Sequence, residues 1–180
     1  NVLTNGTLLT DDALENFLSL GVSVIQIPLL SADASIHDYL TGLPGSWGKA
    51  VDALRRTDHA GIGAAVLVIT KVNAPGVAET LSLMAECDVR TVMVNRFNIG
   101  GNGIRNAREL VPDRKTLQDA FTAVETFAAG NPAMRFVSGV CTPLCYLDTA
   151  PYPHIRFTRC STDLTGRPVT VNYDGDVRFC

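Results

Sequence analysis

The chain has 180 residues, of which 46% are hydrophobic and 18% are charged, and its formal net charge is −3. This composition excludes an intrinsically disordered chain, and the lack of any Lys/Arg block argues against nucleic-acid binding. No apolar run is long enough to cross a membrane and no signal peptide opens the sequence, so we expect a cytoplasmic protein of one domain, with at most a small appendage. Because the sequence begins at Asn1 and stops at Cys180, we expect an internal fragment of a longer protein.

Three apolar segments, at residues 22–30, 62–69 and 89–94, predict β-strands. The second segment is short, almost wholly apolar and rich in β-branched residues. That composition is typical of a strand buried on both faces of a parallel sheet.

Four amphipathic segments alternate with these strands and predict helices. The first follows Thr10 as its N-cap, the second spans residues 46–60, the third starts near Pro75, and the fourth follows Pro112 and Asp113. Alternating strands and helices indicate right-handed βαβ units, and therefore a parallel sheet or barrel. Four such units make about half of an eight-fold barrel or a small doubly wound sheet, and the alternation does not choose between them.

The character of the sequence changes after about residue 136, where helical periodicity ends and prolines become frequent. Residues 169–179 predict a β-hairpin, because Asp174-Gly175 is a strong turn signal between two short β-type runs. We therefore predict a boundary near residue 138, with a cysteine-bearing module after it.

Cysteines are concentrated in this later part: four of the five lie within the last forty residues, at Cys141, Cys145, Cys160 and Cys180. The hairpin would fold Cys180 back toward a cysteine that precedes its first strand. Thiolates suit iron–sulfur clusters or zinc, and the spacing favours neither. The alternative is that they are buried structural thiols, but this segment is too poor in apolar residues for a core of its own. We interpret Cys87, near the end of a helix, as buried.

Polar residues follow the predicted strands at 4–6, 30–33, 70–73 and 95–98. Ligands of α/β folds bind beyond the carboxyl ends of the strands, so these segments are candidates for a binding site. The alternative is that any loop after a buried strand is polar. We interpret His37 and Asp38 as a local structural feature on one helical turn.

Several of these segments resemble the radical S-adenosylmethionine enzymes. T-N-G-T-L-L-T at 4–10 is similar to the end of their third barrel strand, residues 25–47 to the fourth strand and its helix, and residues 94–103 to the sixth strand and its exit. The element from Cys160 through Gly175 to Cys180, C-x14-G-x4-C, is similar to the opening of the SPASM module, which binds an auxiliary iron–sulfur cluster.

The resemblance implies an α/β fold: part of a (β/α) TIM-type barrel over 1–138, then a linker and the start of the SPASM module, a small cysteine-bearing β-hairpin, over 139–180. It implies S-adenosylmethionine and [4Fe–4S] clusters as cofactors. The candidate cofactor contacts at the strand ends are Ser31, Asn95, Arg96 and Phe97. The candidate ligands of the auxiliary cluster are Cys160, Cys180, Cys145 and Cys141.

The resemblance also implies an activity for the intact enzyme, an oxidoreductase. It would generate a 5′-deoxyadenosyl radical for hydrogen abstraction and modify a peptide or protein, with electrons from a reductant such as flavodoxin or ferredoxin. The family's cluster motif, C-x3-C-x2-C, has no match here, so we expect this chain alone to be inactive. The alternatives are a non-radical α/β enzyme or binding domain with a zinc-binding C-terminal knuckle, or an inactive scaffold of the same ancestry.

Overall fold

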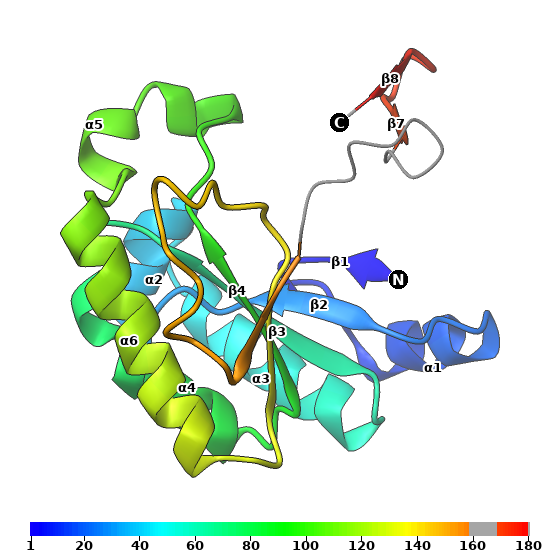
Figure 1. Ribbon diagram of the computed structural model, residues 1–180. Coiled ribbons are helices and arrows are strands. Elements are labelled where there is room, and N and C mark those ends of the chain that lie inside the picture. The colour runs from blue at the N-terminus through cyan, green and yellow to red at the C-terminus, as the bar shows by residue number, and fades with distance from the viewer. Residues whose placement is uncertain (159–168, 180) are drawn as a thin grey trace.

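A computed structural model describes residues 1–158 and 169–179 of the chain (Figure 1). Its main feature is a six-stranded sheet in which every neighbouring pair of strands is parallel. The strands are β1 (Val2–Leu3), β2 (Ile25–Pro28), β3 (Gly63–Ile69), β4 (Thr91–Arg96), β5 (Arg135–Ser138) and β6 (Ile155–Phe157).

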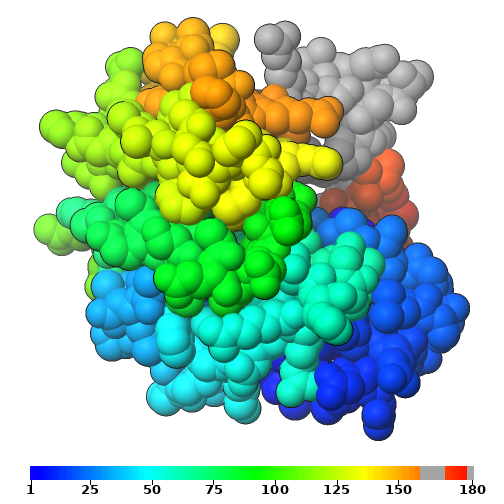
Figure 2. Space-filling model, turned by 90° about the horizontal axis from the view of Figure 1, so that it is seen from below, coloured from blue at the N-terminus to red at the C-terminus, as the bar shows by residue number. Residues whose placement is uncertain are grey.

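The strands lie in the sheet in the same order as in the chain. A doubly wound sheet reverses its strand order at a switch point, whereas a barrel winds in one direction throughout. The space-filling view shows successive chain segments following one another in order across one face (Figure 2). The topology therefore resolves the two alternatives that the sequence leaves open, and the expected partial TIM-type barrel is confirmed.

The helices connect consecutive strands. They are α1 (Asp11–Ser19), α2 (Ala34–Thr41), α3 (Ser46–His59), α4 (Val77–Glu86), α5 (Ala107–Leu110) and α6 (Arg114–Gly130), with 3-10 turns η1 (Ala74–Gly76) and η2 (Gly101–Ile104). The four predicted helices correspond to α1, α3, α4 and α6. The Thr10 hydroxyl accepts the Ala13 N–H at 3.2 Å, so the predicted cap of α1 is confirmed.

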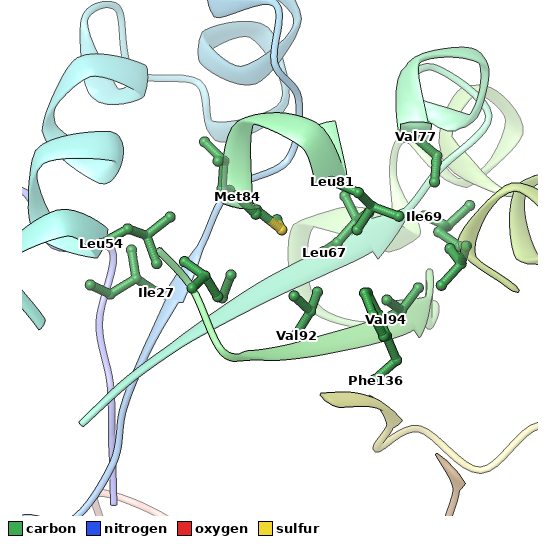
Figure 3. Packing of buried hydrophobic residues seen from close by; sticks show 14 of the residues in the cluster. Ile27, Leu54, Leu67, Ile69, Val77, Leu81, Met84, Val92, Val94 and Phe136 are labelled. Carbon is green, nitrogen blue, oxygen red and sulfur yellow. The ribbon is translucent and has the colours of Figure 1, made fainter. Parts of the chain in front are cut away.

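One face of the sheet packs on the helices. Ile27, Ala65, Val92, Phe136 and Ile155 lie opposite one another in register and are all buried. They belong to one core with side chains of α3, α4 and α6, part of which Figure 3 shows. Because successive residues of a strand point to opposite faces, the next residues along form the inner face of the partial barrel, where Pro28 and Met93 are half-buried. Cys87 is buried, as interpreted from the sequence.

The sheet continues past residue 138, where the sequence predicts a boundary. Residues 139–154 contain no helix, and prolines interrupt them, but the following strand β6 pairs in parallel with β5. Aromatic packing holds this part in place: the Phe121 ring of α6 lies 5.9 Å from that of Tyr152 and 5.4 Å from that of Phe157. Residues 155–157 therefore belong to the sheet of the partial barrel.

The predicted hairpin is confirmed as the antiparallel pair β7 (Val169–Val171) and β8 (Val177–Phe179). Its loop is longer than a two-residue turn, because Val171 pairs with Val177. The Asn172 side-chain oxygen accepts the N–H groups of Asp174 and Asp176, and Gly175 has the left-handed φ of 85°. Cys160 and Cys180 lie outside the described residues.

Across the described ranges, no helix combines the length and apolarity that a membrane crossing requires.

Candidate functional site

A cavity of about 430 Å³ opens at the carboxyl ends of β2, β3 and β4. We call it the mouth cavity. It is lined by Asn5, Pro28, Leu30, His37, Leu40, Thr41, Leu43, Ser46, Val68, Thr70, Phe97 and Leu110. The lining is mostly apolar with a few polar groups, which is the usual make-up of a small-molecule site.

Asn73 ties two strand ends together beneath this cavity. Its side-chain oxygen accepts the backbone N–H and the hydroxyl of Thr70, at 2.7 and 2.9 Å. Its amide donates to the carbonyls of Leu30 and Val68, also at 2.7 and 2.9 Å. Asn73 is buried, and its two bonds with Thr70 are buried as well, whereas those to the Leu30 and Val68 carbonyls are partly buried. The polar segment after β3 therefore fixes the shape of the cavity wall, with Thr70 facing the cavity.

Ser31 and His37 connect the end of β2 to α2. The Ser31 hydroxyl accepts the Asp33 N–H at 3.0 Å, and the Ser31 carbonyl accepts the Trp47 indole N–H at 3.2 Å. His37 Nδ1 accepts the Leu30 N–H at 3.1 Å, and burial lowers the pKa of His37. The imidazole is therefore neutral, with its proton on Nε2. The contact of Ser31 with the cofactor stays a prediction.

Asp38 holds the start of α3. Its carboxylate accepts hydrogen bonds from Gly45 N–H, from the Ser46 hydroxyl at 3.0 Å and from Trp47 N–H at 2.9 Å. These bonds, that from Gly45 foremost, lower the pKa of Asp38 from its ordinary 3.8. His37 and Asp38 thus have the structural roles interpreted from the sequence, while His37 also lines the mouth cavity.

We expect Asp38→Asn to destabilise the chain at pH 7 and to change its response to acid. Because the folded pKa is lowered, the carboxylate stabilises the fold above pH 3.8, and this contribution is lost as the pH falls through the folded pKa. The stability curves of the variant and the native chain should therefore separate at pH 7 and converge in acid. Urea unfolding at pH 7 and pH 3 measures this. Asp52→Asn, at an exposed position of α3, is the matched control. The prediction would be contradicted if the free energy of unfolding of Asp38→Asn differed from that of the native chain by the same amount at both pH values.

The end of β4 carries three of the predicted contacts. The Asn95 side-chain oxygen accepts the N–H groups of Gly139 and Val140, at 2.8 and 3.1 Å, and so ties β4 to the residues after β5. The Phe97 ring lines the mouth cavity. A Cβ atom at Gly103 would lie 2.7 Å from the end of that ring, so a larger residue there would require the ring to move.

Arg96 lines a second cavity, of about 370 Å³, which we call the Arg96 pocket. Its lining residues are Arg96, Phe97, Asn98, Ile99, Val111, Pro112, Pro143, Cys145 and Tyr146. Arg96 Nη2 donates to the Cys141 carbonyl at 3.0 Å, and the Tyr146 hydroxyl donates to the Pro112 carbonyl at 2.7 Å. The segment between β5 and β6 is thereby fastened over the end of β4.

Cys141 and Cys145 lie in this same segment, but they line different cavities. Cys145 faces the Arg96 pocket, and Cys141 lines a third cavity of about 620 Å³. Within residues 1–158 and 169–179, no three His, Cys, Asp or Glu side chains are grouped as a metal site requires. Because Cys160 and Cys180 lie outside those ranges, ligation by the four cysteines stays a prediction.

The structure thus brings Arg96, Phe97 and Cys145 together around one pocket, with Asn95 beside them and Ser31 at the end of β2. Asn73 and His37 also shape the site: Asn73 lies in the predicted candidate segment 70–73 without having been singled out, and His37 was interpreted as structural. The sequence does carry a signal for the helix that positions His37, because Asp33 and Gly42 are residue types that typically flank the start and the end of a helix. Asp33 accepts the Ser35 N–H at 2.7 Å and Gly42 has a φ of 68°, so α2 begins and ends at these two residues.

No protein-family model matches the chain. The chain is 27% identical over 126 residues to the PqqA peptide cyclase of Gluconobacter oxydans, an alignment that covers 69% of this chain and 35% of that protein. The chain therefore spans about a third of the length of the curated relatives it matches.

Two solved structures have a similar fold. Streptococcus suis SuiB bound to S-adenosylmethionine has a TM-score of 0.62 at 14% identity, over 81% of this chain and 34% of that one. Native anSMEcpe with bound S-adenosylmethionine and a Kp18Cys peptide has a TM-score of 0.58 at 18% identity, over 72% of this chain and 36% of that one. Together with the sequence relatives, these folds support the resemblance: the chain is similar to radical S-adenosylmethionine/SPASM-type enzymes and carries part of their fold.

Proposed function

We propose that this chain forms the cofactor- and substrate-binding end of a radical S-adenosylmethionine oxidoreductase that modifies a peptide or protein. One observation carries the proposal: the mouth cavity lies at the carboxyl ends of consecutively wound parallel strands. In (β/α) barrels that end of the strands is where the active site is built. The relatives support the same end point, since one is a peptide cyclase and one similar structure holds both S-adenosylmethionine and a peptide.

The lining of the mouth cavity fits a nucleoside. Phe97 offers an aromatic face for a base, Leu30 and Val68 offer apolar walls, and Asn5 and Thr70 offer hydrogen-bonding groups for ribose hydroxyls. S-adenosylmethionine held there would supply radical chemistry, the abstraction of a hydrogen atom from the substrate. Asn95, through Gly139 and Val140, and Ser31, through Asp33, hold the surrounding backbone in position. The predicted cofactor contacts Ser31, Asn95, Arg96 and Phe97 are part of this proposal.

The clusters need residues beyond those described. Cys141 and Cys145 supply two thiols, and we propose that they act with Cys160 and Cys180 at an auxiliary [4Fe–4S] cluster. The described residues do not group three potential ligands for a metal. We further propose a cytoplasmic enzyme, with no nucleic-acid or membrane partner, that draws electrons from a flavodoxin- or ferredoxin-type reductant.

We expect Val68→Phe to weaken binding of S-adenosylmethionine at least about tenfold, because the added ring fills the mouth cavity. Saturation-transfer NMR on the ligand measures weak binding to the chain without any cluster. Val171→Phe adds the same ring at an exposed position of the hairpin and should bind as the native chain does. Equal binding by a folded Val68→Phe variant, as judged by circular dichroism, would exclude the mouth cavity as the cofactor site.

A further inference from the structure

We propose that the Arg96 pocket is a subsite for a carboxylate on the substrate, the acidic side chain of a peptide, and that Arg96 is its anion partner. The inference rests on the proposed function for the identity of the substrate as a peptide. Arg96 would be a specificity-determining residue, and the group that it recognises would be a carboxylate. Neither the fold nor the relatives assign this role.

The guanidinium of Arg96 has no anionic partner among the described residues. The described ion pairs join Arg56 to Asp11, Lys115 to Asp119 and His154 to Glu125. Arg96 instead donates to carbonyl and amide oxygens, and two of those bonds, from Nη1, are long at 3.4 Å. Its Nε atom is buried and has no hydrogen-bond partner within the described ranges. A buried donor without a partner is costly, and an anion bound to the guanidinium would supply the counter-charge that the described residues lack.

The shape of the Arg96 pocket limits which anion fits. Arg96 is the one charged side chain among its described lining residues, and most of the others are apolar: Phe97, Ile99, Val111, Pro112, Pro143 and Tyr146. A group with an apolar stem and a carboxylate at its end matches that lining. The planar fork of an arginine suits the two oxygens of a carboxylate. Glutamate and aspartate side chains have this form.

The arrangement is set before a ligand arrives. The 3.0 Å bond from Nη2 to the Cys141 carbonyl fixes one edge of the guanidinium. The segment that holds Cys141 is itself fastened by the Tyr146 hydroxyl on the Pro112 carbonyl. A positioned cation loses little side-chain entropy on binding, which favours recognition.

The position of Arg96 assigns this carboxylate to the substrate and not to the cofactor. Arg96 lies two residues after Val94, which faces the helices, so its side chain leaves β4 on the helix side of the sheet. The mouth cavity is lined from the opposite, inner face by Val68 and Thr70, and Phe97 lines both cavities. A cofactor that fills the mouth cavity therefore leaves the Arg96 pocket beside it for the substrate.

The test is NMR of the Arg96 guanidinium N–H signals in the 180-residue chain, titrated with N-acetylglutamate α-amide. We expect a saturable downfield shift, and at least about tenfold weaker binding of the uncharged N-acetylglutamine α-amide. Arg96→Gln should abolish binding of the glutamate probe, followed through the backbone signals. Arg105→Gln, which removes an exposed arginine just after η2, should leave it unchanged. Equal binding of the two probes, or no shift at Arg96, would overturn the proposal, and both are measured on the unmutated chain.

A second titration separates this proposal from the proposed function. If S-adenosylmethionine displaces the glutamate probe from Arg96, the carboxylate subsite belongs to the cofactor, and the substrate assignment is wrong. If S-adenosylmethionine binds nowhere on the chain while the glutamate probe still binds Arg96, the carboxylate subsite stands and the mouth cavity fails as a cofactor site. Independent binding of both ligands supports the two proposals together.

Discussion

We expect Asn73→Ala to lower the free energy of unfolding by at least about 3 kcal/mol. The substitution removes all four hydrogen bonds of a buried side chain and leaves groups of Thr70, Leu30 and Val68 without partners. Each buried polar group left unpaired costs about 1–3 kcal/mol, and water can reach only some of them through the mouth cavity. Urea unfolding followed by circular dichroism measures the loss.

Asn73→Asp gives a sharper test, because it keeps the shape and replaces one heavy atom, the amide nitrogen, by oxygen. At pH 7 a carboxylate oxygen would replace the amide nitrogen that donates to the Leu30 and Val68 carbonyls. This buried oxygen and the two carbonyl oxygens are all hydrogen-bond acceptors, so they would repel one another with no donor between them. The folded pKa of this new carboxyl would be raised by burial and by the facing oxygens. The variant should therefore gain stability as the pH falls through that raised pKa, since the protonated carboxyl can donate one bond.

The control for both variants is Asn106→Ala, which removes an exposed asparagine with one bond of 3.4 Å and should change stability by less than about 0.5 kcal/mol. An Asn73→Ala loss as small as that of the control would show that Asn73 does not fix the strand ends. Asn73→Ala should also weaken the binding of S-adenosylmethionine, because Leu30 and Val68, which Asn73 holds in place, line the mouth cavity.

The parts of the fold that depend on local interactions could be predicted from the sequence. Thr10 and Asp113 each accept a backbone N–H three residues ahead, and such caps are visible in a short window. The buried strand β3 is likewise marked by its own composition. Strand order could not be predicted from alternation, because a barrel and a doubly wound sheet share the same local units.

Most of the site depends on partners that are distant in the sequence. Asn73 reaches the Leu30 carbonyl 43 residues away, and Asn95 reaches the Gly139 N–H 44 residues away. The sequence shows that both are polar residues in segments that follow strands, which suits ligand binding and loop bracing equally well. Only the positions of the strand ends show that these two side chains brace the backbone. The unpartnered Arg96 Nε is also a property of the assembled site and has no signal in the sequence.

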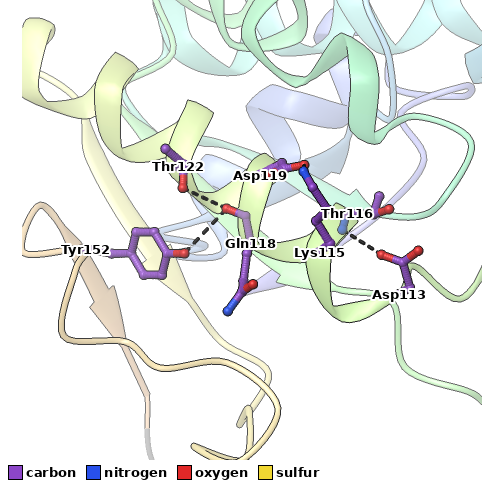
Figure 4. A network of polar contacts seen from close by, with 7 residues as sticks. All are labelled: Asp113, Lys115, Thr116, Gln118, Asp119, Thr122 and Tyr152. Atoms are coloured by element: carbon purple, nitrogen blue, oxygen red, sulfur yellow. Dashed lines mark hydrogen bonds and ion pairs between the residues drawn. The ribbon is translucent and has the colours of Figure 1, made fainter.

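The short strand β6 is a further case, because three residues carry no usable periodicity. What places it is the aromatic cluster of Phe121, Tyr152 and Phe157, which joins β6 and the end of the preceding segment to α6. The Tyr152 hydroxyl also reaches the Gln118 carbonyl of α6, which accepts the Thr122 hydroxyl too (Figure 4). Tertiary contacts to a long helix therefore form a strand that the local sequence does not predict.

We expect Phe121→Ala to lower the free energy of unfolding by about 3–5 kcal/mol, the usual cost of removing a fully buried phenylalanine ring. The cavity would open beside Tyr152 and Phe157, so the loss should be concentrated where β6 packs on α6. Chemical unfolding measures the total. Hydrogen exchange should show residues 139–157 opening more readily than β3, which lies deeper in the sheet.

Phe121→Leu and Leu144→Ala are the controls for this change. Leucine refills most of the space and should recover much of the loss, while Leu144 is 70% exposed and should be nearly neutral. The result bears on function, because residues 139–154 carry Cys141 and Cys145 and cover Arg96. If the aromatic cluster positions this segment, Phe121→Ala should also weaken binding of the glutamate probe at Arg96 while β3 keeps its protection. Uniform loss of protection across the sheet would instead mean that Phe121 supports the whole partial barrel and does not specifically position residues 139–154.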